Sequence, residues 1–145
     1  MSAITITVVP NLQHPRFADC AEIRRIVFQV GQEVSREREV DGLDGHSVHF
    51  IADVDGRPTG TARYRVKDGW AKAERVAVLA RARRTGLGRA LMSALESHAR
   101  EQGINGVILS SQEEAISFYE KMHYRVVGES YLDAGIPHRD MKKPF

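Results

Sequence analysis

Cysteine is almost absent from this 145-residue sequence, which has a single one, Cys20. One cysteine excludes an intrachain disulfide, and such sparing use is typical of proteins that work in a reducing compartment. The thiol sits among the apolar residues Phe17, Ile23 and Val27. We therefore expect position 20 to hold a buried, inert thiol and not a nucleophile.

Long apolar runs and strong net charge are missing as well. The N-terminal stretch ITITVV is short and follows no basic leader, so we expect neither a signal peptide nor a membrane span. A net charge of +2 gives little reason to expect nucleic acid as a partner. His46 and His49 lie on opposite faces of a strand, and no other His/Cys cluster suggests a metal site. These absences predict a cytoplasmic protein with no membrane, nucleic-acid or metal partner.

Length and composition predict one globular domain over residues 1–145. The chain is 42% hydrophobic and 28% charged, as folded domains are, and 145 residues are too few for two ordinary domains. No repeat, low-complexity tract or linker interrupts the sequence.

The most informative stretch is Glu74–Leu95, ERVAVLARARRTGLGRALMSAL. Apolar residues alternate at its start, as in a strand, and recur at helical spacing from Leu87 onward. The loop between them carries four arginines and ends in Gly86 and Gly88. Backbone amides free of side chains, a helix N-terminus and guanidinium groups together favour a phosphate-bearing ligand.

Two familiar phosphate loops are excluded by the letters of this stretch. A nucleoside-triphosphate loop needs Lys-Ser or Lys-Thr after its last glycine, and a dinucleotide loop needs a third glycine where Leu91 stands. What remains is RxxGxG at residues 83–88. By itself this word also fits a tight strand-to-helix turn with solvated arginines, so both interpretations stay open at this point.

The apolar pattern of the whole chain predicts a sheet with helices. We expect strands near residues 4–9, 47–54, 58–66, 70–78, 106–110, 124–132 and 138–143, and helices near 17–30, 87–103 and after residue 110. The connection from the strand that ends at residue 78, through a helix, to residues 106–110 predicts a parallel crossover. Ser110 or Ser111 is expected to cap the helix that follows.

In order and in wording, the chain resembles the GNAT N-acetyltransferase superfamily. ERVAV and RTGLGRALM look like its coenzyme segment, and SFYEKMHY looks like its FYxxxGF signature. The words EIRRIVF, EREVDGLDGHSVHF, GTAR, SSQEEAISFYEK and GIPHRDM look more narrowly like its ElaA-like group. His123 departs from the pattern, because it stands where the signature has glycine. The resemblance implies an α/β (α+β) fold with a mixed, mostly antiparallel sheet and one parallel crossover at the coenzyme loop.

The resemblance implies acetyl-coenzyme A as co-substrate and no metal. Two sets of residues match the coenzyme segment. The strand residues would bond the pantetheine arm through their amides, and the loop residues would hold the pyrophosphate. They are Val76, Ala77, Val78, Arg83, Arg84, Thr85, Gly86, Leu87, Gly88 and Arg89.

Acetyl transfer to an amine also needs a base and an acid. An alkyl ammonium has a pKa of about 10.4, so its proton must be removed before attack. Glu74, on the same strand face as Val76 and Val78, is the first candidate base, although an exposed carboxylate at a strand start would look the same. Tyr119 matches the family's proton donor for the thiolate, although its apolar-face position also fits a core tyrosine.

The acceptor is expected to meet the acidic segment between the first helix and the next strand. Its candidate substrate-binding residues are Glu39, Asp41, Asp44 and His46, and a solvated surface loop is the alternative interpretation. A small-molecule or peptide amine would suit such a rim, and the protein is expected to act as a monomer or homodimer. Two functions stay open: an active N-acetyltransferase, or an acyl-CoA-binding sensor or partner module with weak catalysis.

Overall fold

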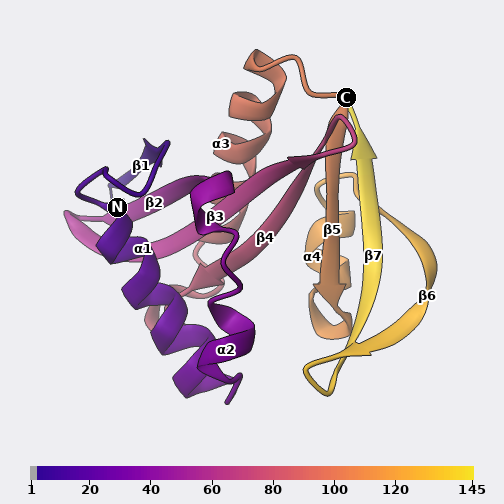
Figure 1. Cartoon of the computed structure of the whole chain (residues 1–145), viewed down its shortest axis with the longest axis horizontal. Coiled ribbons are helices and arrows are strands. Elements are labelled where there is room, and N and C mark those ends of the chain that lie inside the picture. The colour runs from indigo at the N-terminus through magenta and orange to yellow at the C-terminus, as the bar shows by residue number, and fades with distance from the viewer. Residues whose placement is uncertain (1–2) are drawn as a thin grey trace.

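The computed structural model describes residues 3–145 and places them around one seven-stranded sheet (Figure 1). The strands follow the order β1-β2-β3-β4-β5-β7-β6. Their bounds are β1 Ile4–Val9, β2 Val48–Val54, β3 Arg57–Lys67, β4 Trp70–Val78, β5 Gly106–Gln112, β6 Arg125–Asp133 and β7 Ile136–Pro144. All neighbouring pairs are antiparallel except β4 and β5, which run parallel. The mixed sheet and the single parallel crossover predicted from the sequence are confirmed.

Helices cover both faces of this sheet. The helix α1 (Phe17–Arg24) continues as a π-helical segment, Arg25–Gly31, so the helix expected over 17–30 is present with a wider final part. On the opposite face, α3 (Leu87–Glu101) and α4 (Ile116–Glu120) pack over the larger core. The short helix α2 (Arg36–Glu39) lies in the polar stretch between α1 and β2. In Figure 1, α1 and α2 lie in front of the sheet and α3 lies behind it.

The alternation of side chains along each strand fixes these two faces. In β2, Phe50 and Ala52 belong to the core under α3, whereas Ile51 belongs to the smaller core under α1. The smaller core also contains Cys20, whose side chain is fully buried, as expected. Its thiol donates to the Phe50 carbonyl, and burial raises the pKa of Cys20 above its ordinary value.

One expected helix start is wrong. Ser110 and Ser111 do not cap the helix after β5, because both lie within the strand, which continues to Gln112. The Ser111 hydroxyl donates to the Gln112 carbonyl 2.8 Å away. A 3-10 turn, Glu113–Ala115, then leads into α4 without a side-chain cap. Strand pairing with β7 through residue 112 overrides the local capping pattern.

The turn after α4 gives His123 a left-handed backbone, with φ of 74°. A side chain with a Cβ costs about 1–2 kcal/mol in this region, and glycine costs far less. His123 therefore adopts the conformation that the glycine of the family signature would adopt, at a cost in stability.

His123→Gly should raise the free energy of unfolding by roughly 0.5–1 kcal/mol, because the relief of strain exceeds the extra entropy of an unfolded glycine. Denaturant unfolding of the two proteins measures the difference. Lys121→Gly is the control, since Lys121 has an ordinary φ of −65° and its replacement should destabilise the chain. Equal losses in both variants would contradict strain at His123.

Candidate active site

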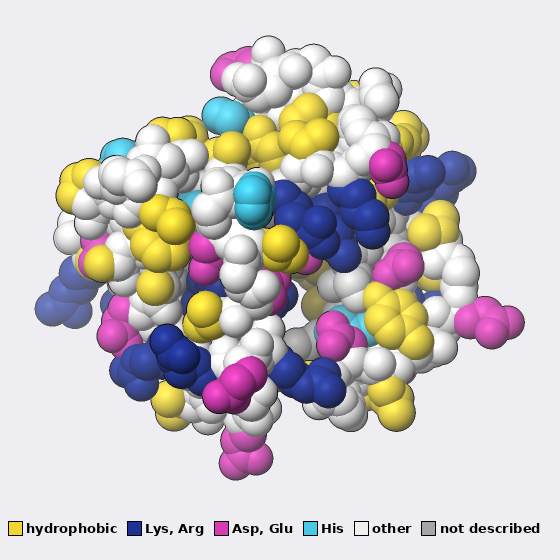
Figure 2. Space-filling view, viewed as in Figure 1, with side chains coloured by type: hydrophobic (Ala, Val, Ile, Leu, Met, Phe, Trp, Pro, Cys, Tyr) yellow, Lys and Arg dark blue, Asp and Glu magenta, His cyan; other side chains and the backbone are white. Residues whose placement is uncertain are grey.

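A bulge in β4 opens the sheet between two parallel strands. The register of β3 and β4 shifts between Thr61 and Arg63, and Arg75 in the bulge has a φ of 56°. The parallel pairing of β4 with β5 ends just before the bulge, at Ala73 and Leu109. The two strands diverge from there and border a cleft of about 1000 Å³. Figure 2 shows its mouth as a hollow flanked by Lys, Arg and acidic side chains.

The N-terminus of α3 faces one end of this cleft. Gly86 precedes the helix with a φ of 86°, and the first helical hydrogen bond runs from the Ala90 amide to the Gly86 carbonyl at 3.0 Å. The amides of residues 87–89 therefore have no acceptor within the helix, which makes this end attractive to an anion.

The side chains around that helix end suit a phosphate group. Gly86, Gly88, Arg83, Arg84 and Arg89 all border the cleft. A Cβ at Gly88 would lie 3.2 Å from the Phe118 ring, so a larger side chain there would fill the cleft. Guanidinium groups can each hold phosphate oxygens with two hydrogen bonds.

Two residues of the predicted coenzyme loop turn their side chains elsewhere. Leu87 is 1% exposed and packs in the core under α3, and the Thr85 hydroxyl donates to the Ala82 carbonyl. If these two residues bind the coenzyme as predicted, they do so through their backbone amides. Val76, Ala77 and Val78 all border the cleft, as predicted.

Tyr119 reaches the cleft from α4. Its ring packs edge-on against Phe118 and Tyr124, with centroids 4.9 and 5.7 Å away, and the residue is only 8% exposed. Burial raises the pKa of Tyr119 to about 12. Among residues 3–145 its hydroxyl makes no hydrogen bond. The phenol therefore stays protonated at neutral pH and is free to donate to a group bound in the cleft.

Glu74 borders the same cleft from β4, but the predicted shared face with Val76 and Val78 is wrong. The bulge at Arg75 shifts the alternation, so both valines pack against the core under α3 while Glu74 points to the other face, where cations surround it. Its Oε1 accepts hydrogen bonds from Arg63 Nη2 at 3.1 Å and Arg65 Nε at 3.0 Å. Lys72 Nζ lies 3.8 Å from Oε2. Only Oε2 is therefore available to an incoming amine.

The predicted acceptor-binding acids form an internal ion network. Glu39 pairs with the buried Arg24 at 2.5 Å. Asp44 pairs with Arg24 and with the buried Arg63, at 2.6 Å each. Asp41 pairs with Arg63 at 2.6 Å and with Arg75 at 3.3 Å. These carboxylates neutralise buried guanidinium groups, and of the three only Glu39 borders the cleft. Their role in binding an amine stays a prediction.

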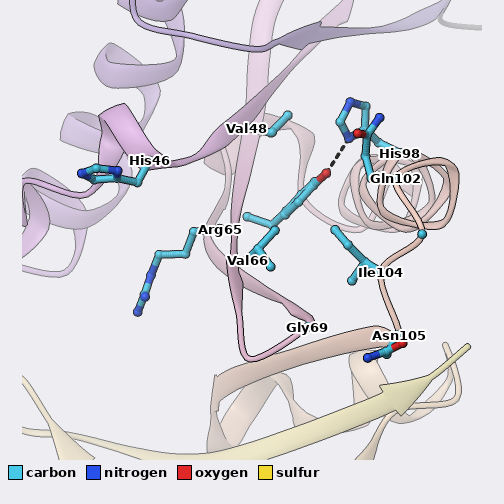
Figure 3. Close-up of a pocket in the computed structure, with 11 residues that line it drawn as sticks. His46, Val48, Arg65, Val66, Gly69, His98, Gln102, Ile104 and Asn105 are labelled. Carbon is cyan, nitrogen blue, oxygen red and sulfur yellow. Dashed lines mark hydrogen bonds between the residues drawn. The ribbon is translucent and has the colours of Figure 1, made fainter.

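His46 borders a second cavity of about 450 Å³ and not the cleft (Figure 3). This cavity borders the C-terminal end of α3, at Gln102 and Gly103, and contains a 2.6 Å hydrogen bond between the Tyr64 hydroxyl and His98 Nδ1. The His46 ring points away from that pair. Glu74 and Tyr119 thus border the cleft and His46 does not.

Sequence reasoning missed several polar residues of the cleft, among them His138 near the start of β7. Its Nδ1 donates to the Ile136 carbonyl at 2.7 Å, because a carbonyl can only accept. The word GIPHRDM contains this histidine, but only the pairing of β7 with β5 shows that it faces the cleft.

Known proteins are similar to this chain in sequence and in fold. Residues 20–145 match the family model of the acetyltransferase (GNAT) domain. The chain is 43% identical to the uncharacterized N-acetyltransferase YjcF of Bacillus subtilis over 126 residues, 86% of this chain and 90% of that protein. The chain belongs to the GNAT acetyltransferase family. Membership makes it an acyltransferase and confirms the resemblance found in the sequence.

Solved structures agree with the fold of this acetyltransferase. An acyl-CoA N-acyltransferase from Pseudomonas aeruginosa superposes with a TM-score of 0.85 at 29% identity, over 97% of this chain and 99% of that one. Escherichia coli ElaA superposes with a TM-score of 0.86 at 23% identity, over 97% and 99% of the chains, which shows a shared fold. No helix in residues 3–145 combines the length and apolar character that a membrane crossing needs.

The ion network predicts how this acetyltransferase responds to acid. Burial opposes ionisation of Asp41, but hydrogen bonds from Arg63 outweigh it and lower the pKa of Asp41 to about 2. Since an unfolded Asp titrates at about 3.9, the pair stabilises the fold fully above pH 4 and less as the pH falls toward 2.

Asp41→Asn should lower the free energy of unfolding at pH 7 by about 1 kcal/mol, a figure reduced for the partial exposure of the pair. The variant should also lose less stability than wild type between pH 4 and pH 2. Urea unfolding across this range measures both effects. Asp68→Asn, at an exposed carboxylate outside the network, is the control. The same pH dependence in wild type and Asp41→Asn would contradict the assignment.

Proposed function

We propose that this acyltransferase moves the acetyl group of acetyl-coenzyme A to a primary amine by direct attack in a ternary complex. The observation that carries the proposal is that one cleft brings together an unpaired strand edge, a helix N-terminus with three arginines and a protonated tyrosine. Each meets a different requirement of the reaction.

The strand edge and the helix end fit the two parts of the coenzyme. Beyond Ala73, β4 has no strand partner on its β5 side. The Leu79 amide bonds Thr59 of β3, and Ala77 pairs with Thr61, so the amides of Val76 and Val78 point to the open side and can bond the pantetheine arm as a neighbouring strand would. The amides of residues 87–89 and the side chains of Arg83, Arg84 and Arg89 suit the pyrophosphate. The same strand amides would orient and polarise the thioester carbonyl.

The chemical roles follow from the positions of two side chains. Tyr119 protonates the departing thiolate, since its hydroxyl is protonated and lacks another partner in residues 3–145. Glu74, the base predicted from the sequence, faces the amine through Oε2, where it can hold an ammonium group or accept its proton. The acceptor is a small-molecule or peptide amine, and a cytoplasmic location and a monomeric or homodimeric state remain expectations from the sequence.

A catalytically weak sensor of acyl-coenzyme A is the competing function, and His123 was its only support in the sequence. The structure shows His123 in the left-handed conformation that glycine would adopt, so the turn after α4 is kept. Both functions need the coenzyme site. They differ in whether an amine causes release of free coenzyme A.

A panel of primary amines tests the function, with free thiol released from acetyl-coenzyme A and the acetylated product both measured. The proposal expects thiol release that depends on one class of amine. Gly88→Val is the control without a working coenzyme site, because the valine side chain would crowd the Phe118 ring and occupy the cleft beside the helix N-terminus. Coenzyme binding without turnover of any amine would favour the sensor, and absence of binding would contradict both functions.

Tyr119→Phe should lower kcat by roughly 100-fold to 10,000-fold, because it removes the acid but keeps the ring that packs on Phe118 and Tyr124. Acetyl-coenzyme A affinity and the melting temperature should barely change, and both are measured on the same sample. Wild-type kcat from pH 6 to 9, with a substrate whose chemical step is rate-limiting, would make Tyr119 a core residue only.

A further inference from the structure

His138 and Glu74 lie on the same face of the sheet, on opposite sides of the cleft. In an antiparallel pair directly opposed residues share a face, and His138 opposes Gln112 of β5. Leu109 of β5 and Ala73 of β4 point into the core under α3 and α4, so Gln112 and Glu74, at odd offsets from them, point to the other face. Tyr119, in that core, approaches the cleft from the α4 side.

The surroundings of His138 set the position of its proton. Because Nδ1 donates to the Ile136 carbonyl, the neutral ring carries its lone pair on Nε2. Within residues 3–145 Nε2 has no hydrogen-bond partner. The atom is not fully buried, so a group bound in the cleft can reach it. The ring stacks on Tyr131 at a centroid distance of 6.1 Å, and the residue is 9% exposed. His138 is an oriented imidazole with one free acceptor atom at the cleft.

Glu74 is better placed to bind a cation than to act as an unoccupied base. Its Oε1 already accepts hydrogen bonds from Arg63 and Arg65, and Lys72 Nζ lies 3.8 Å from Oε2. An anion held in this way can instead attract an ammonium group through Oε2.

The geometry points to His138 as the general base of the acetyl transfer, with Glu74 holding the charged amine. This inference rests on the proposed function and names a residue that it left out. Nε2 takes one proton from the ammonium group, directly or through a water, and the freed lone pair forms the C–N bond with the thioester carbonyl carbon. The C–S bond breaks, the thiolate takes the Tyr119 proton, and the second amine proton restores the phenol. The imidazolium then releases its proton to solvent, so the reaction yields the amide, free coenzyme A and one proton.

Several charged groups surround His138 and bear on its pH dependence. The Tyr131 hydroxyl of β6 donates to Asp140 of β7 at 2.6 Å, next to the stacked rings. Across the cleft stand Lys72 and Glu74, and Asp133 borders it at the end of β6. An imidazole base is recognised by a rise of activity between about pH 5 and 8.

His138→Asn is the informative variant, because the Asn side-chain amide can still donate to the Ile136 carbonyl while Nε2 is removed. With an alkyl amine from the panel, kcat/KM should fall by about 100-fold or more, and the rise of activity between pH 5 and 8 should disappear. His14→Asn is the matched control, at a half-buried histidine outside the cleft, and should keep wild-type kinetics.

The pKa of the amine separates a base from a structural residue. A weakly basic amine, such as an acyl hydrazide, is already neutral at pH 7.5, so no base has to remove a proton from it before attack. With it the His138→Asn loss should shrink to less than 10-fold, whereas a residue needed only for packing would reduce both reactions equally. Equal losses with both amines would overturn the inference. So would a pH profile in which Glu74→Gln, and not His138→Asn, removes the rise of activity between pH 5 and 8. Neither result would contradict the proposed acetyltransferase function.

A measurement without turnover provides an independent check. In ¹⁵N spectra of histidine-labelled protein, the neutral form of His138 should carry its proton on Nδ1. A proton on Nε2 would overturn the inference even if the panel finds a substrate. By contrast, a wild-type protein that binds acetyl-coenzyme A and acetylates no amine would overturn the proposed function itself.

Discussion

The bulge at Arg75 is the constraint on which the site depends. It places a non-glycine residue at a φ of 56°, which costs about 1–2 kcal/mol. Contacts of the Arg75 guanidinium with the carbonyls of Arg38 and Glu39 and with Asp41 offset this cost. Without the bulge, β4 would continue to pair with β5 beyond Ala73, and the strand edge that can bond a pantetheine arm would be closed.

The same contacts join the bulge to the rest of the molecule. Arg24 of α1 and Arg63 of β3 are buried and share Asp44, while Asp41 connects Arg63 to Arg75. Loss of one partner from such a network leaves a buried charge without compensation, which destabilises more than loss of the whole pair. The acidic segment therefore supports the bulge through the contact of Asp41 with Arg75.

Local patterns in the sequence predicted the strands, the crossover and the helix after Gly86, because periodicity and glycine placement report backbone structure directly. The partners of side chains were harder to predict. Asp41 and Asp44 look like a solvated acidic rim until β3 brings Arg63 beside them, and Ser111 looks like a helix cap until β7 extends β5. His138 enters the cleft only through strand pairing across the sheet. These are contacts between distant segments, which no local pattern contains.

Amide hydrogen exchange with and without acetyl-coenzyme A tests the central claim most directly, namely that the cleft opened by the bulge is the coenzyme site. The account predicts slower exchange on binding at residues 76–78 of β4 and 87–89 of α3, and unchanged exchange around Tyr64, His98 and Gln102 beside the second cavity. Protection confined to the second cavity, with none at the strand edge or the helix N-terminus, would contradict it.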